Sequence, residues 1–120
     1  MFKHTLVEFD ELESETKNGK RFYITPDGNK YPSVTTVCSL ATVQKIKEWR
    51  KRVGNEKANK ISAKASSRGT KVHKLVEDYV GNKELNFEDV LPVNLFMFKQ
   101  IKPILDTYLE NVYAIECPLY

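Results

Sequence analysis

The chain has 120 residues, of which 41% are hydrophobic and 29% are charged, and its net charge is +3. This composition is ordinary for a globular protein, and the length allows a single domain, residues 1–120, with a modest core. No apolar run approaches the ~18 residues of a membrane helix, and the N-terminus lacks the apolar stretch of a signal peptide. Two cysteines, 79 residues apart, argue against a disulfide scaffold and a cysteine-based zinc site. We therefore expect a cytoplasmic protein with no membrane partner.

The first third of the chain predicts a polar segment followed by a β-hairpin. Residues 1–20 are polar and acidic, and at most a short strand at 5–9 is expected there. Residues 21–25 are aromatic and β-branched, 26–29 have turn chemistry, and further β-branched residues follow. The pattern predicts a hairpin over residues 21–37.

From residue 42 the apolar period becomes helical and predicts a basic helical region, 42–81, made of two helices. Thr42 fits the N-cap of the first helix, and Gly54 should end it. The second helix should start directly afterwards and end at Gly81–Asn82. Ser66–Gly69 is a segment where this second helix can kink or break.

Residues 91–120 predict a third helix and a C-terminal strand. Pro92 suits the first turn of the helix, and Pro103 should bend it. Residues 112–120 have the pattern of a strand that lacks a following partner, so we expect the chain to be truncated. The fold class expected is an α+β fragment: an N-terminal hairpin, about three helices and a terminal strand.

Positive charge is concentrated in residues 43–74, which sum to +9, whereas the rest of the chain sums to −6. Basic side chains of the second helix recur every three or four residues and form one stripe beside its apolar face. A solvated helix face is the alternative interpretation, but such a stripe can follow a nucleic-acid backbone and release its counterions. The members of the stripe are Lys57, Lys60, Lys64, Arg68, Lys71 and Lys74.

Four residues outside the stripe are further candidates for DNA contacts. Ser33 and Thr35 could donate hydroxyl groups to a phosphate, although both residue types are common in strands. Trp49 could stack on an unpaired base beside the charge of Arg50, although its helical spacing with apolar neighbours favours a core position. The expected ligand is DNA, preferably single-stranded.

His73 and Glu77 lie four residues apart on the other flank of the apolar face. A neutral imidazole can bind a divalent metal, and a carboxylate can be a second ligand or orient the histidine. On these two residues alone, a surface ion pair or a histidine at the core edge is the favoured interpretation. Gly69, one turn before His73, permits another group to approach the backbone closely.

Several blocks in fixed order resemble the N-terminal half of RecB-like PD-(D/E)XK exonucleases, particularly those of phages and mitochondria. The blocks are Arg21–Tyr23 with Pro26–Gly28, Tyr31–Val37, Trp49–Arg50 with Val53–Gly54, and Arg68–Thr70 with His73 and Glu77. The resemblance implies the N-terminal part of an α/β nuclease core that hydrolyses DNA phosphodiester bonds with Mg²⁺ or Mn²⁺. It also implies that His73 is a metal ligand, with Glu77 as an optional second one.

The family's aspartate strand and (D/E)xK strand would follow the segment that contains Glu116, and this chain stops at Tyr120 before either. We therefore expect the N-terminal segment of a metal-dependent DNA exonuclease, inactive alone and completed by a second polypeptide. A phage-infected bacterial cell would suit such a protein. The alternative is a non-catalytic DNA-binding or nuclease-docking protein that uses the basic region 43–74.

Overall fold

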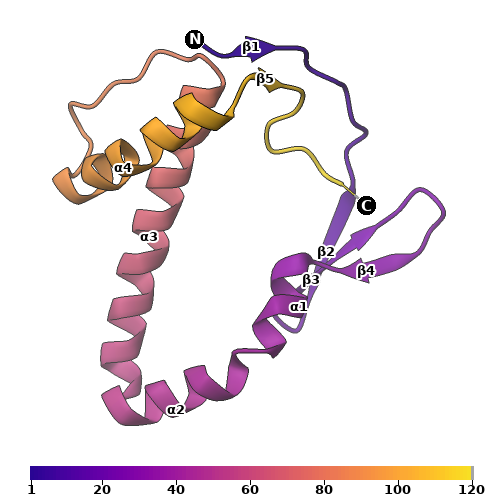
Figure 1. The fold of residues 1–120 in the computed structure, drawn as a ribbon. Helices are drawn as coiled ribbons and strands as arrows, with labels where there is room; N and C mark the ends of the chain where they lie inside the picture. The colour runs from indigo at the N-terminus through magenta and orange to yellow at the C-terminus, as the bar shows by residue number, and fades with distance from the viewer. Residues whose placement is uncertain (120) are drawn as a thin grey trace. The chain divides into compact units, whose positions relative to one another are not determined.

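The computed structural model describes residues 1–119, which form a mixed α+β structure with four helices and five short strands. The chain divides into two compact units (Figure 1). Unit 1 comprises residues 1–8 and 60–117, and unit 2 comprises residues 9–59 together with Pro118 and Leu119. Within the described residues, no helix has the length and apolar character needed to cross a membrane.

Unit 2 contains a three-stranded antiparallel sheet, in the order β2 (Glu13–Lys17), β3 (Lys20–Ile24) and β4 (Lys30–Pro32). The predicted hairpin between β3 and β4 is confirmed. The expectation of only weak structure before residue 20 is wrong at β2. This strand pairs with β3 through a two-residue turn. Both turn residues, Asn18 and Gly19, have positive φ, as the commonest hairpin turn requires.

The strand expected at residues 33–37 is wrong, because α1 (Val34–Leu40) occupies this segment. Ser33 starts the helix: its backbone is extended, and its Oγ accepts a hydrogen bond from the backbone N–H of Thr36 at 3.1 Å. This cap satisfies one of the donors that the first turn leaves without a partner. Capping chemistry has therefore outweighed the β-branched composition of the segment.

The first predicted basic helix is confirmed as α2 (Val43–Val53). Gly54 ends it with φ 86°, and the Gly54 N–H donates to the carbonyl of Arg50 at 2.9 Å. Thr42 is the N-cap residue of α2, as predicted, and its carbonyl accepts from the Ile46 N–H at 3.0 Å. Its side chain makes no capping hydrogen bond within the described residues, because the hydroxyl donates to the carbonyl of Ser39 at 3.2 Å.

The second predicted basic helix is α3 (Asn55–Val80), which passes without interruption through Ser66–Gly69. The break considered at that segment is therefore wrong. The helix ends where predicted: the Gly81 N–H donates to the carbonyl of Glu77 at 2.9 Å, and Asn82 has φ 56°.

The third predicted helix is α4 (Pro92–Tyr108), which starts at Pro92 and includes Pro103. It crosses the C-terminal part of α3 (Figure 1). The ring of Tyr79 packs edge-on against Phe98 with centroids 5.6 Å apart, and its hydroxyl donates to Asp106. The buried apolar side chains of unit 1 come from three elements and are Val72, Leu75, Phe98 and Val112.

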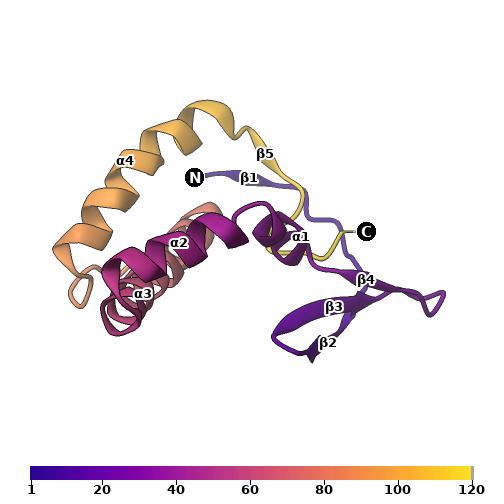
Figure 2. The ribbon, with the colours of Figure 1, turned by 90° about the horizontal axis from the view of Figure 1, so that it is seen from below.

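The N-terminus joins unit 1 through β1 (Lys3–His4), which pairs in parallel with β5 (Asn111–Val112) (Figure 2). This strand replaces the one expected at residues 5–9. The Asn82 side chain holds the backbone of Phe2 by accepting from its N–H at 2.8 Å and donating to its carbonyl at 2.7 Å. The predicted C-terminal strand is confirmed only at Val112. Residues 113–119 lie outside any strand, and Tyr120 lies outside the described residues.

Candidate functional site

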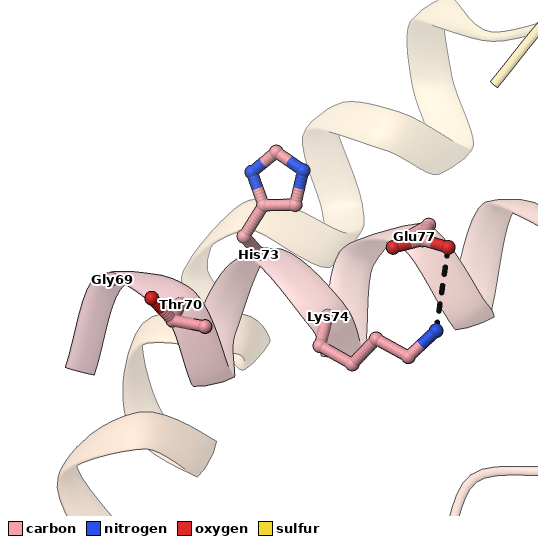
Figure 3. A pocket seen from close by; sticks show the side chains of 5 residues that line it. All are labelled: Gly69, Thr70, His73, Lys74 and Glu77. Atoms are coloured by element: carbon pink, nitrogen blue, oxygen red, sulfur yellow. Dashed lines mark hydrogen bonds and ion pairs between the residues drawn. The ribbon is translucent and has the colours of Figure 1, made fainter. Parts of the chain in front are cut away.

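An open hollow on the surface of α3 is lined by Gly69, Thr70, His73, Lys74 and Glu77 (Figure 3). The spacing of four residues places Gly69, His73 and Glu77 on successive turns of one helix face. Apart from its chain neighbours and the backbone of α3 itself, a methyl group added at Gly69 would meet no atom of the described residues within 4 Å. The space beside the Gly69 backbone is therefore open.

His73 is paired with a carboxylate, but not with the one that the sequence suggested. Its Nε2 atom lies 2.7 Å from Oε1 of Glu116, and the two side chains are 61% and 58% exposed. Glu116 has φ 50°, a left-handed backbone conformation that is uncommon for residues with a side chain. Since a carboxylate oxygen only accepts hydrogen bonds, Nε2 donates in this pair. Both groups remain accessible from solvent.

Glu77 faces a cation instead of His73 (Figure 3). The Lys74 ammonium lies 3.3 Å from Oε1 of Glu77 and 3.0 Å from Oδ1 of Asp78. Hydrogen bonding to Asp78, and then to Glu77, raises the pKa of Lys74, and the Lys74 hydrogen bond lowers the pKa of Asp78. The positive charge of Lys74 is therefore balanced by the two neighbouring carboxylates. A metal ion that binds Glu77 would have to displace Lys74 from its carboxylate.

Two carboxylates near His73 could act as metal ligands: Glu116 contacts it, and Glu77 lies one helical turn away. Nowhere in residues 1–119 do three His, Cys, Asp or Glu side chains gather into a group that could hold a metal ion. No family model, curated protein or solved structure matches the chain. The His73–Glu116 pair and the exposed cations of α3 are therefore the features of the chain that bear on its function.

Three cations of the predicted stripe, Lys64, Arg68 and Lys71, are exposed and form no salt bridge with another residue of the described chain. They belong to the part of α3 in unit 1, as does Lys60. At ~100° per residue, Lys71 and His73 lie about 160° apart around the helix axis. One phosphate cannot contact both, so a nucleic acid that reaches both groups has to pass across α3.

The remaining predicted DNA-contact residues belong to unit 2, as does Lys57 of the stripe. Ser33 is buried and its hydroxyl is committed to capping α1, with the Thr35 hydroxyl 3.1 Å away. Trp49 is half-buried. Arg50 donates through Nη1 to Oδ1 of Asn59 at 2.8 Å, which joins α2 to the start of α3. The polar groups of Ser33, Thr35 and Arg50 therefore each have a local structural partner within the described residues.

Sequence reasoning missed Glu116 as a partner of His73. Forty-three residues separate the two, so no helical or strand spacing relates them. The only local signal was that Glu116 follows an apolar, β-branched segment near the expected last strand. The pair forms because residues after β5 return to the surface of α3, a long-range relationship that only the folded chain shows.

Proposed function

We propose that this chain supplies the N-terminal segment of a metal-dependent DNA exonuclease of the PD-(D/E)XK type. The observation that carries the proposal is the exposed pair of His73 and Glu116, with Nε2 and Oε1 2.7 Å apart. An imidazole nitrogen and a carboxylate oxygen at this separation can act as two donors to one divalent cation, and Mn²⁺ accepts both donor types. The open backbone at Gly69 leaves room for a substrate next to the pair.

When bound, Mg²⁺ or Mn²⁺ polarises a phosphoryl oxygen and lowers the pKa of a bound water molecule. His73 would hold the ion through Nε2, which requires the neutral ring to carry its single proton on Nδ1 instead of on Nε2. Glu116 would be the second donor. Glu77 would be a weaker one, because Lys74 already contacts its carboxylate.

The rest of the catalytic machinery is proposed to come from a second polypeptide. It would contribute the further acidic ligands and the lysine of the (D/E)xK motif, which the resemblance described above implies. The proposal thus predicts negligible hydrolysis by this chain alone and activity after the two polypeptides combine. A cytoplasmic location, for example in a phage-infected bacterial cell, would give the complex access to DNA.

Metal binding can be tested on the chain alone, because it contains only two histidines. Mn²⁺ is titrated into the protein while the imidazole proton signals are followed by NMR. The His73 signals should broaden at lower Mn²⁺ concentration than those of His4, whose Nε2 lies 2.6 Å from the carbonyl of Val80. Glu116→Gln should weaken the effect and Glu77→Gln should weaken it less. Equal broadening of both histidines would contradict the assignment of His73.

Nuclease activity is tested by mixing the chain with a polypeptide that carries an aspartate strand and a (D/E)xK strand, with Mn²⁺ and single-stranded DNA. Degradation should require both polypeptides and should be lost with His73→Ala. A mixture that degrades DNA equally well with His73→Ala would overturn the role of His73. Lys83→Ala is a matched control, because Lys83 contacts Asp78 in the same unit but lies outside the hollow.

A second candidate function is non-catalytic binding to DNA, or docking on a nuclease, through the basic region 43–74. The exposed cations Lys64, Arg68 and Lys71 favour it, because they form no salt bridge within residues 1–119 and so remain available to phosphate. Replacing all three by alanine should reduce the slope of log affinity against log salt by about 2 to 3 for single-stranded DNA. Binding that is metal-independent and unaffected by His73→Ala would favour this function over the nuclease.

A further inference from the structure

Helix α4 has two apolar faces, and the described residues of unit 1 cover only one of them. Asn94 and Phe98 are buried on the side that packs in unit 1. On another side, five large apolar residues are between 37% and 77% exposed. We call these residues, together with Gln100 between them, the open α4 face: Val93, Phe96, Met97, Gln100, Ile104 and Tyr108.

The open α4 face is continuous and carries no charge. At ~100° per residue its six members fall within an arc of about 120°, the width of a typical buried helix face. The charged residues of α4, which are Lys99, Lys102 and Asp106, all lie outside this arc. Lys102 and Asp106 are paired with each other at 2.7 Å. A contiguous apolar face of this size marks an interaction surface more often than a solvated one.

We propose that the open α4 face binds the same face of a second copy of this chain, with the two helices antiparallel. The sequence of the face is nearly symmetric about Gln100. Two-fold pairing there brings Phe96 opposite Ile104 of the partner subunit and places Val93 within one residue of the partner's Tyr108. The two Gln100 side chains meet at the axis, where each amide can donate to and accept from the other.

Charge and area both fit this occupant. Because the face is neutral, two copies meet without like-charge repulsion, and nothing on it selects a charged partner. Side chains of this size expose on the order of 600 Å² per chain, so pairing buries about 1,200 Å², the lower end of stable protein interfaces. The dimer does not depend on the proposed nuclease activity, and its failure would leave that proposal unaffected.

Cross-linking tests the geometry directly. Both native cysteines are first replaced by serine, since Cys38 is exposed and Cys117 is partly exposed. Gln100→Cys in this background should form a disulfide-linked dimer under mild oxidation, because position 100 lies at the two-fold axis. Val93→Cys is the matched control: seven residues from the axis, the two copies would be about 21 Å apart and should not cross-link.

Light scattering tests the association itself. The unmodified chain should show the mass of a dimer, and Phe96→Asp combined with Ile104→Asp should give a monomer with unchanged helical circular dichroism. Lys99→Glu, outside the face, should remain dimeric. A monomeric unmodified chain, as expected if another part of this chain or a different protein covers the face, would overturn the proposal. So would a dimer that survives the double substitution, or equal cross-linking through positions 93 and 100.

Discussion

The Nε2 atom of His73 on α3 lies 2.7 Å from Oε1 of Glu116, beyond β5. Both side chains are more than half exposed, and ion pairs in such positions contribute at most about 1 kcal/mol to stability. We expect His73→Ala to change the free energy of unfolding, measured by urea denaturation, by less than about 1 kcal/mol. A loss of Mn²⁺ binding in this variant would then report a missing ligand. A cost above about 2 kcal/mol would instead identify His73 as a structural residue.

Gly69→Ala should separate stability from function. Glycine inside a helix costs about 1 kcal/mol relative to alanine. Outside its chain neighbours and the α3 backbone, the added methyl group meets no atom of the described residues within 4 Å. Unit 1 should therefore become more stable, as seen in a higher urea midpoint. If a ligand approaches the backbone beside His73, the same methyl group should weaken its binding. A stabilised variant with unchanged metal and DNA affinity would show that the hollow on α3 is not used.

The carboxyl group of Asp106 should titrate at lower pH than an ordinary aspartate. Hydrogen bonds from Lys102, and then from the Tyr79 hydroxyl, lower its pKa. A pKa lowered in the folded state means that the stabilisation is present above the unfolded pKa and is lost as the pH falls through the folded pKa. Tyr79→Phe keeps the ring but removes the hydroxyl, so the pKa of Asp106 should rise. Carbon-detected NMR titration checks this prediction. Lys102→Met should raise the pKa of Asp106 more than Tyr79→Phe does, because Lys102 is the larger cause of the shift.

Ser33→Ala should act on stability and not on DNA binding. The Ser33 hydroxyl caps α1 from a buried position, and loss of such a cap costs about 1 kcal/mol. Thr35→Ala, two residues later and exposed, is the control and should cost less. Denaturation measures both effects, and a salt titration with single-stranded DNA should give the same slope for both variants. A reduced slope for Ser33→Ala would instead indicate that the Ser33 hydroxyl contacts a DNA phosphate.

Local chemistry predicted much of the fold. The helical period located α2, α3 and α4, and the glycines at 54 and 81 marked two helix ends, because these signals lie within a few residues of one another. The Asn18–Gly19 turn carries an equally local signal for β2, yet the acidic composition around it favoured the expectation of weak structure. At Ser33 two local signals conflicted, and the cap outweighed strand propensity.

The long-range relationships could not be predicted in the same way. The pairing of β1 with β5 joins residues more than 100 positions apart, and the His73–Glu116 pair joins residues 43 apart. No periodicity connects such residues. The basic stripe was predictable from helical spacing. The ion pair between Lys74 and Asp78 could be recognised only from the side-chain positions in the folded chain. The candidate site was thus half predictable: the histidine from its local motif, the carboxylate partner only from the fold.

The placement of β1 has a consequence for how the chain tolerates change. Unit 1 holds residues 1–8 by β1–β5 pairing and by the Asn82 clamp on Phe2, so residues 9–59 form a loop closed at both ends. The entropic cost of closing such a loop grows only with the logarithm of its length. Doubling the length adds about 0.6 kcal/mol. Insertions within residues 9–59 would therefore scarcely loosen the N-terminal strand. A single backbone cut there would convert residues 1–8 into a dissociable peptide ligand of unit 1.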